Sequence, residues 1–450
     1  MDKLFEHTSI PKAYFTLAMP VVLSMVVTLV YNMVDTFFVS QTQNPNLVAG
    51  VSQSAPIFTF LIALGDIFGL GGSSVISRLF GEKQDQLGRN VSGYAFYGSI
   101  LCGIIVTIIM LVFKTPILHL LGATSATWQY ANEYYTVLVS GATFIVFGLA
   151  PTNILRTEGL ALESMKASMI GTILNIILNP IFIFPLGLGA AGSATATVIS
   201  QIISDGFLIY YTHTKSTRLT TSIKETKISR HLQWELFAIG IPASVTNIMS
   251  TFAIALTNHY LIPYGADSVA AMGIALKIST IINMVFVGFA FGAQPLIGYT
   301  YGAKDAKRFN QIMKFDLQVV CGFSIIMTVL MFILAPTLMK GFLHDPRVIS
   351  EGAGMIRWLV LSSTFAGIML VFTTMFQSMG NAFPAFLLSV SRQGLIFFIV
   401  IVITSQLFGY TGVIVAQPIA DVLTAGLGIL LFLIYRTRFK SKTRRERNVD

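Results

Sequence analysis

The chain has 450 residues, of which 54% are hydrophobic and only 11% are charged. Ordinary soluble domains carry roughly 25% charged residues, so the composition excludes a soluble protein and predicts an all-α membrane protein. The formal net charge of +9 would suit nucleic acid, but the basic residues gather in short segments between apolar runs. We therefore expect no nucleic acid as a partner. The two cysteines are isolated in apolar runs and predict neither a disulfide nor a metal site.

Apolar runs, taken in chain order, divide the sequence into candidate membrane-spanning helices. About 20 apolar residues in a helix cross the roughly 30 Å of hydrocarbon in a bilayer. The sequence predicts twelve transmembrane helices, at residues 13–39, 52–77, 92–113, 129–153, 167–186, 190–212, 235–262, 268–299, 315–336, 352–376, 393–408 and 412–435. The eleventh is marginal in length. The first residues lack the pattern of a removable signal peptide, and we expect none.

Glycine and proline positions recur about 221 residues apart. The pairs are Pro20 and Pro242, Gly81 and Gly302, Gly159 and Gly380, and Gly192 and Gly412. This period predicts an internal duplication into two pseudo-symmetric six-helix lobes, which are parallel repeats because each half has an even number of spans. The predicted boundaries are residues 1–212 for the N-terminal lobe, 213–233 for a cytoplasmic linker, 234–435 for the C-terminal lobe and 436–450 for a basic cytoplasmic tail.

The distribution of Lys and Arg predicts the orientation in the membrane. Nearly all of the 29 such residues lie in segments on one side of the predicted spans, and Arg156 and Arg392 are counted with them. The opposite side holds only Lys114, Lys340 and Arg347. Because basic residues concentrate on the cytoplasmic side of membrane proteins, both termini are predicted to be cytoplasmic.

Asp35 is the leading functional candidate, because it lies inside the first apolar span. A carboxylate at membrane depth is costly unless it faces a cavity, finds partners or takes up a proton. Tyr31 and Asn32 precede it by four and three residues, so all three are expected on one helical face. This group could bind protons or a cation. The alternative is a structural carboxylate bonded to a neighbouring helix.

The fifth span carries Asn175 and Asn179, four residues apart and just before Pro180. Two amides on one helical face could form a hydrogen-bond network with the first-span carboxylate or a loose oxygen shell for a monovalent cation. Asn153 in the fourth span and Thr197 in the sixth could complete such a network. The alternative is amide contacts that only hold helices together.

Other acidic residues within spans are weaker candidates. Asp66 lies near mid-membrane in the second span and could be a second proton site. Asp205 lies closer to the cytoplasmic end of the sixth span, where it could simply reach water, and Asp421 has no predicted role. In the second half, the repeat positions of the two fifth-span amides are Ile396 and Val400. We therefore expect the N-terminal lobe to hold the coupling site.

Sequence signatures of catalysis are absent. The chain contains no GxxxxGK[ST] phosphate loop, no HExxH and no Gly-x-Ser-x-Gly elbow. We therefore expect neither an enzyme nor a resident cofactor.

Five stretches, in order along the chain, resemble the MATE (multidrug and toxic compound extrusion) transporters. They are VYNMVDTFFVS, GLGGSSVISRLFGEKQ, ILRTEGL, LNIILNPIFIF and MFQSMGNAFPAFLLSVSRQ. The resemblance covers roughly residues 10–435 and implies a twelve-helix, two-lobe exporter of amphipathic, often cationic, drug-like compounds. It implies exchange for protons or sodium, a multi-pass location in the bacterial plasma membrane (the cell inner membrane), and a link to antibiotic resistance. We expect a monomer.

The resemblance also assigns residues. The family's first-span aspartate maps to Asp35, and its fifth-span Asn-x-x-x-Asp pattern maps to Asn175 and Asn179, with an amide where many relatives carry a carboxylate. The C-lobe acidic residues of the NorM-like branch are missing, which favours the branch that resembles DinF- and MepA-type proteins. Fewer charges are then available for a sodium ion.

Two other functions stay open at this stage. A flippase for a lipid-linked precursor, from the wider superfamily, would need a polar and often basic cavity, and the predicted spans contain few cations. A non-transporting membrane receptor or scaffold would show no gradient-driven flux.

Overall fold

The computed structural model describes residues 3–342 and 345–446. Within these ranges, every regular element is a helix. By its contacts the chain forms two compact units. Unit 1 comprises Met1–Ile248, Phe291–Ile312 and Ser378–Gly380, and unit 2 comprises Met249–Ala290, Met313–Gln377 and Asn381–Asp450. These units follow contacts, whereas the predicted boundaries at residues 212 and 234 follow the repeat in the sequence and stay a prediction.

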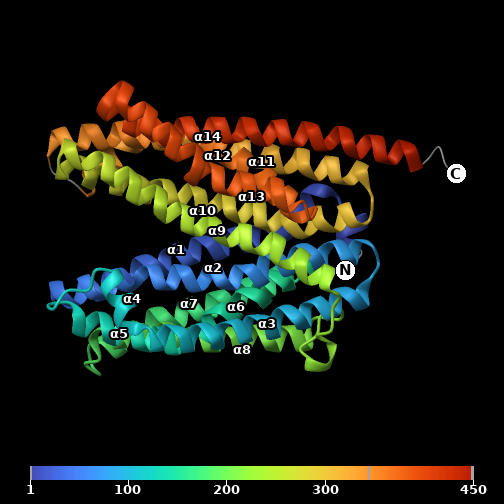
Figure 1. Cartoon of the computed structure of the whole chain (residues 1–450), viewed down its shortest axis with the longest axis horizontal. Helices are drawn as coiled ribbons and strands as arrows, with labels where there is room; N and C mark the ends of the chain where they lie inside the picture. Colours follow the sequence, from blue (N-terminus) through green and yellow to red (C-terminus); the bar gives the residue numbers. More distant parts are fainter. Residues whose placement is uncertain (1–2, 343–344, 447–450) are drawn as a thin grey trace. The chain divides into compact units, whose positions relative to one another are not determined.

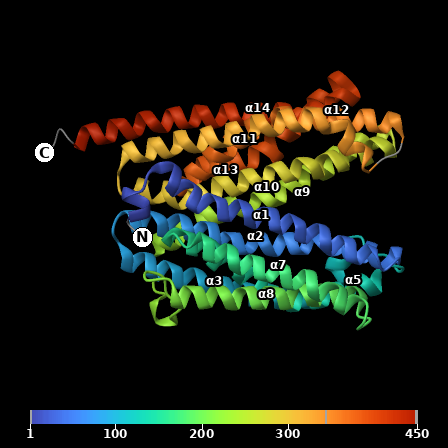
Figure 2. The ribbon, with the colours of Figure 1, turned by 180° about the vertical axis from the view of Figure 1, so that it is seen from behind.

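The long helices of unit 1 run lengthwise beside one another (Figures 1 and 2). The helices of unit 1 are α1 (Ile10–Ser40), α2 (Pro45–Gly81), α3 (Asp85–Val112), α4 (Lys114–Leu120), α5 (Trp128–Ser140), α6 (Ala142–Ile154), α7 (Ala161–Ile183) and α8 (Gly189–Thr214), with the short helices η1 (Lys3–His7), η2 (Leu155–Glu158) and η3 (Ile223–Glu225). Helix α7 packs between α1 and α8, and α2 packs on α3, α5 and α6. Helix α9 (Arg230–Leu261) begins in this unit and continues into unit 2.

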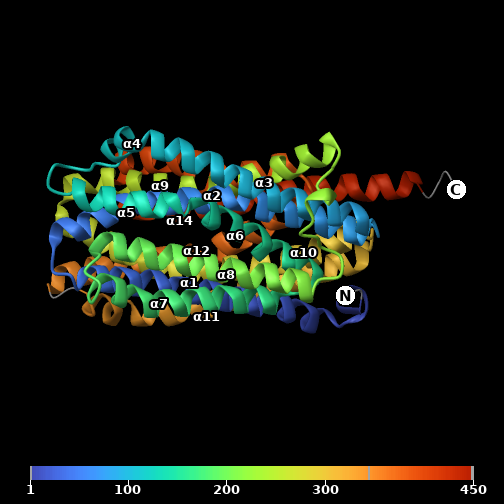
Figure 3. The ribbon, with the colours of Figure 1, turned by 90° about the horizontal axis from the view of Figure 1, so that it is seen from below.

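Unit 2 contains most of the remaining helices. They are η4 (Ile262–Tyr264), α10 (Ala266–Gly302), α11 (Ala306–Lys340), α12 (Pro346–Ser378), α13 (Ala382–Val390), η5 (Ser391–Leu395) and α14 (Ile396–Glu446). The last part of α14 runs on as one continuous helix toward the C-terminus (Figure 3).

Local sequence explains where these helices begin and which side chains they expose. Asn44 caps α2 by accepting hydrogen bonds from the backbone N–H groups of Asn46 and Leu47, and Pro45 occupies the first turn. On α3, Ile104 and Ile108 are one turn apart and both are exposed. An apolar stripe open to the surroundings is what a helix that faces lipid requires.

The predicted twelve-span fold is confirmed. Nine described helices are long and apolar enough to cross a membrane, or ten if α5 and α6, bent by 49°, form one span. Helix α8 is not counted among them, and the segment Ala382–Tyr435 is counted once. Gly409, with φ 57° and ψ −128°, divides that segment into two helices, so the described chain contains all twelve predicted spans.

The eleventh span differs from its prediction. We placed it at residues 393–408 and assigned Arg392 to the preceding loop. In the structure the helical segment begins at Ala382 and continues through the π-helix η5, which contains Arg392. Hydropathy placed the start of the eleventh span after Arg392, because a charged residue lowers the local hydropathy. In the structure this charged residue lies inside the helix.

Candidate functional site

Asp35 is held by side chains from two neighbouring helices of unit 1. Its Oδ1 accepts a hydrogen bond of 2.6 Å from Asn179 Nδ2 on α7 and one of 2.8 Å from Ser193 Oγ on α8. Helices α1, α7 and α8 lie alongside one another in Figure 3. Asp35 Oδ2 accepts no hydrogen bond from any residue that the structure describes, and the side chain is only half-buried. One oxygen is therefore fixed and the other is open.

A second chain of hydrogen bonds runs through Thr197, one turn after Ser193 on α8. Tyr31 Oη and Thr197 Oγ1 share a hydrogen bond of 3.1 Å, and Asn175 Nδ2 donates to the same hydroxyl at 3.3 Å. Thr197 Oγ1 in turn donates to the backbone oxygen of Ser193 at 3.2 Å. The phenol, the amide and the hydroxyl predicted from the sequence are thus brought together.

Both fifth-span amides keep an unused acceptor. The Oδ1 atoms of Asn175 and Asn179 are buried and have no hydrogen-bond partner among the residues that the structure describes. Buried polar atoms are nearly always bonded, so these two oxygens call for an explanation. An acceptor-rich site beside an open carboxylate oxygen suits a proton, whose O–H needs an acceptor, or a monovalent cation, which needs oxygen ligands.

The sequence positions these groups through a repeated spacing of four residues. Tyr31 and Asp35 on α1, and Asn175 and Asn179 on α7, each share a helical face. Close approach of α8 to α7 depends on Gly192, where an added Cβ would meet the backbone carbonyl of Phe182 at 2.8 Å. Small residues permit such close helix contacts in membranes.

Three of the predicted site residues lie outside this network. Asn32 is exposed. Asp66 Oδ2 accepts a hydrogen bond of 3.4 Å from Asn247 Nδ2 on α9. Asn153 accepts one of 3.1 Å from Arg156 Nη1. Asp66 and Asn153 therefore take part in a separate polar cluster of unit 1, together with Asn247 and Arg156.

Sequence reasoning missed several polar residues. Ser193 lies four residues before Thr197, so the spacing rule would have found it. Arg156 was assigned to a loop but is 4% exposed. Asp205 was expected to reach water, yet it is 3% exposed, with Gln201 Nε2 donating to its Oδ1 at 2.8 Å. The Oδ2 atom of Asp205 is buried without a partner.

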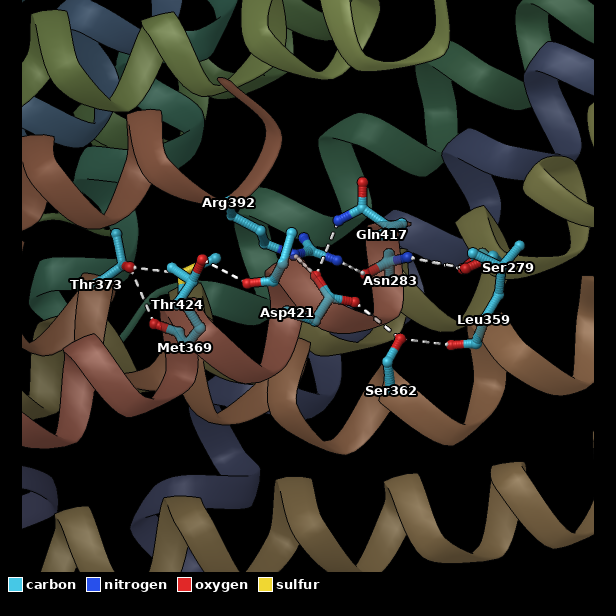
Figure 4. Close-up of polar contacts among 11 residues, drawn as sticks. Ser279, Asn283, Leu359, Ser362, Met369, Thr373, Arg392, Gln417, Asp421 and Thr424 are labelled. Atoms are coloured by element: carbon cyan, nitrogen blue, oxygen red, sulfur yellow. Dashed lines mark hydrogen bonds and ion pairs between the residues drawn. The ribbon is translucent and has the colours of Figure 1, made fainter. Parts of the chain in front are cut away.

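Unit 2 contains a charged network that we did not predict (Figure 4). Arg392 Nε donates to Asp421 Oδ1 at 2.9 Å, and Arg392 Nη2 donates to Asn283 Oδ1 at 3.2 Å. Gln417 Nε2 also donates to Asp421 Oδ1 at 2.9 Å, and Ser362 Oγ donates to its Oδ2 at 2.9 Å. The sequence placed Asp421 inside a span without a role and Arg392 in a loop, whereas the structure pairs the two side chains. The four-residue spacing of Gln417 and Asp421 was the available signal.

Metal binding through clustered ligands has no support in the part of the chain that the structure describes. No group of three His, Cys, Asp or Glu side chains there could hold a metal ion.

Comparison with known proteins decides the family. The model of the family described as MatE matches the chain twice, over residues 20–181 and 242–403. The chain belongs to the MatE family. The two matches have the same length and bear out the internal duplication predicted from the glycine and proline pairs.

Relatives of this MatE protein extend the likeness over nearly its whole length. The multidrug export protein MepA of Staphylococcus haemolyticus (strain JCSC1435) is 29% identical over 96% of this chain and 95% of its own. A structure described as MATE in complex with MaL6 has a TM-score of 0.92, 25% identity, and covers 98% of this chain and 99% of that one. The outward-facing conformation of a multidrug resistance MATE family transporter of the MOP superfamily also gives a TM-score of 0.92, at 25% identity over 98% of both chains. The resemblance to the MepA-type branch is confirmed, and the chain is a multi-pass membrane protein.

Proposed function

We propose that this protein is a multidrug efflux antiporter that exports amphipathic, mainly cationic compounds in exchange for protons. The observation that carries the proposal is the state of Asp35. Neutral donors hold one of its oxygens, and the other accepts no hydrogen bond from a described residue. A carboxylate placed in this way inside a membrane-spanning helix needs a proton or a cation to neutralise it.

Protons fit this site better than sodium ions. A protonated Asp35 becomes a hydrogen-bond donor, and the buried Oδ1 atoms of Asn175 and Asn179 offer acceptors that have no other partner. A sodium ion would have one carboxylate as its only negative ligand, because the amide of Asn179 stands where many relatives carry a second one. Replacement of that carboxylate by an amide lowers the charge available to a cation and leaves proton binding possible.

The transport cycle follows from the protonation of this carboxylate. When the site faces outward, a proton binds to Asp35 and the cationic cargo leaves. When it faces inward, the proton leaves to the cytoplasm and a new cargo cation binds. The gradient drives export only if Asp35 binds its ion with different free energy in the two states.

The location and assembly belong to the same proposal. The excess of Lys and Arg on one side of the spans supports cytoplasmic termini, and the bacterial source of the MepA relative supports the bacterial plasma membrane. We propose that the monomer transports, with drug-like small molecules and the bilayer as its partners.

Dye flux into proteoliposomes tests this function. Wild type and Asp35→Asn are compared with a proton gradient and a sodium gradient imposed separately, with ethidium as cargo. We expect wild-type flux to follow the proton gradient and flux through Asp35→Asn to fall to the level of empty liposomes. Asn32→Ala, changed at an exposed position on the same helix, is the matched control and should transport like wild type. Equal flux through wild type and a folded Asp35→Asn would contradict the proposal.

One observation supports the flippase alternative and another weakens it. Arg392 lies inside the eleventh span and Arg156 is buried, so the chain has more cations at depth than we expected. However, Arg392 already contacts Asp421 directly. Flux that follows neither gradient would favour a flippase and call for lipid-linked substrates, and complete absence of flux would favour a receptor or scaffold.

A further inference from the structure

The polar cluster around Asp66 contains two opposite charges that do not contact each other. Its members come from four elements of unit 1: Asp66 from α2, Asn153 from α6, Arg156 from η2 and Asn247 from α9. None of them belongs to the Asp35 network. We call these four residues the Asp66–Arg156 cluster.

Arg156 is a buried cation whose hydrogen bonds are incomplete. Its Nη1 donates to Asn153 Oδ1, while its Nε is buried without a partner. The side chain is 4% exposed. A guanidinium has five N–H donors, and leaving a buried charged group without partners is costly. The position is therefore prepared for an acceptor that the described residues do not provide.

Asp66, the carboxylate of the cluster, also has few hydrogen-bond partners. Its one recorded partner is the amide of Asn247, at 3.4 Å. No direct ion pair joins Asp66 to Arg156 among the residues that the structure describes. Asp66 keeps part of its surface accessible although it lies midway along α2. It is therefore a carboxylate that an incoming ligand could reach.

The separation of the two charges is built into the packing. Opposite charges attract strongly in a low-dielectric interior, and unit 2 shows a direct pair between Arg392 and Asp421 at 2.9 Å. In the Asp66–Arg156 cluster each charge is bonded to an amide instead.

Helix contacts fix one of these amides in place. Asn153 Nδ2 donates to the backbone oxygen of Leu149 at 2.9 Å, which directs its Oδ1 toward Arg156. Gly69 brings α2 against α6 at this level, because a Cβ there would lie 2.6 Å from the Leu149 oxygen and 2.7 Å from Asn153 Nδ2. The position of Asn153 is thus held by a hydrogen bond to the backbone and by the close approach of the two helices.

We propose that the Asp66–Arg156 cluster is a cargo subsite that takes a zwitterionic group, with a carboxylate on Arg156 and the cationic end on Asp66. The inference rests on the proposed transport function and adds a cargo class to it. A purely cationic ligand would satisfy Asp66 and leave Arg156 without an acceptor, and a purely anionic ligand would do the reverse. A ligand with both charges supplies both missing partners without adding net charge to the interior.

Equilibrium binding of two related dyes tests the subsite. Rhodamine 6G is a cationic ethyl ester, and rhodamine 19 is its free acid, which carries the same cation and a carboxylate. Their affinities are measured by fluorescence polarisation with purified protein and no ion gradient. Wild type is compared with Arg156→Gln, Arg156→Lys and Asp66→Asn, each first checked for a monodisperse, wild-type-like elution profile.

The subsite predicts a selective loss. Arg156→Gln should weaken rhodamine 19 binding about tenfold, as expected for a lost charged hydrogen bond, and leave rhodamine 6G within about twofold of wild type. Arg156→Lys should recover part of the loss, and Asp66→Asn should weaken both dyes. Equal losses for both dyes in Arg156→Gln, or no loss for either, would overturn the proposal.

Failure of the transport function gives a different result. If the protein does not couple flux to a gradient, Asp35→Asn and wild type give the same flux in proteoliposomes. The binding assay with Arg156→Gln uses no gradient, so its result for the two dyes is independent of that outcome. Asn32→Ala, changed at an exposed position outside both polar groups, serves as the control in that assay and should keep the wild-type difference between the two dyes.

Discussion

Unit 1 holds Asp35 with two neutral donors, Asn179 and Ser193, whereas unit 2 holds Asp421 with the guanidinium of Arg392 as well as with neutral groups. Both carboxylates lie within membrane-spanning helices. Asp421 has a fixed cation of the chain as its counter-ion, and its two oxygens accept hydrogen bonds from three side chains. Asp35 has an open oxygen and no cation bonded to it among the described residues.

This difference separates a carboxylate that can exchange partners from one that cannot. Protonation of Asp421 would remove the counter-ion of the partly buried guanidinium of Arg392, which is unfavourable. Asp35 can bind a proton or a cation without such a cost. The comparison therefore supports the proposal that ion exchange takes place in unit 1 and that the network of unit 2 holds its helices together.

The largest expected effect on stability comes from breaking the ion pair between Arg392 and Asp421 in unit 2. Arg392→Met leaves Asp421 buried and without its counter-ion, and we expect the protein to lose about 3 to 5 kcal/mol of unfolding free energy. The double variant Arg392→Met with Asp421→Leu should recover most of this loss, because no uncompensated charge remains. Chemical denaturation in detergent measures both. A single variant as stable as wild type would show that Asp421 needs no fixed cation.

A smaller effect is expected where α8 approaches α7 in unit 1. Gly192→Ala places a Cβ 2.8 Å from the backbone carbonyl of Phe182, so the helices must separate and move Ser193 away from Asp35. Overpacking of this kind costs about 1 to 3 kcal/mol, and we expect proton-driven flux to fall as well. Gly206→Ala on the same helix meets nothing within 4 Å and is the matched control. Unchanged stability and flux in Gly192→Ala would show that the close contact is not required.

The smallest effect concerns a third carboxylate, outside the membrane-spanning segments. A hydrogen bond from Thr220 and then the contact with Arg89, whose Nε donates at 2.8 Å, lower the pKa of Glu225. A lowered folded-state pKa stabilises the linker above the unfolded pKa of about 4.3 and loses that contribution as the pH falls through the folded value. Protease protection of the linker should therefore be constant from neutral pH to about pH 5 and decline below it.

The control for that measurement is Glu225→Gln, which should give protection that does not change over the same pH range. Because Glu225 and Arg89 are both partly exposed, water and salt weaken their interaction. Loss of protection that is equal in the two proteins would assign the pH dependence to other groups.

Much of the site could be predicted from the sequence because its residues follow helical spacing. The helix rotates about 100° per residue, which places Tyr31 about 40° to one side of Asp35 and Asn32 about 60° to the other. The structure turns the side of Tyr31 toward α8 and leaves Asn32 exposed. Spacing identifies a shared face but cannot say which edge of that face meets a neighbouring helix.

The missed residues have a different physical cause. Arg156 lies just after the end of α6 and Arg392 lies within the π-helix η5, and hydropathy counts both as loop residues. Their partners Asn153 and Asp421 lie inside spans, and a guanidinium can reach several ångströms along a helix to meet them. Only packing between helices shows that Arg156 is buried and that Arg392 is partly buried. The twelve spans and the duplication needed no such information, because composition and period alone encode them.

Proton release on cargo binding tests the central claim most directly. Ethidium is added to purified protein in a weakly buffered solution with a pH-sensitive dye, for wild type and Asp35→Asn. The account predicts that wild type releases a proton as the cation binds, and that a folded Asp35→Asn releases none. Equal proton release from both proteins, or cation binding to wild type with no release, would contradict the assignment of ion exchange to Asp35.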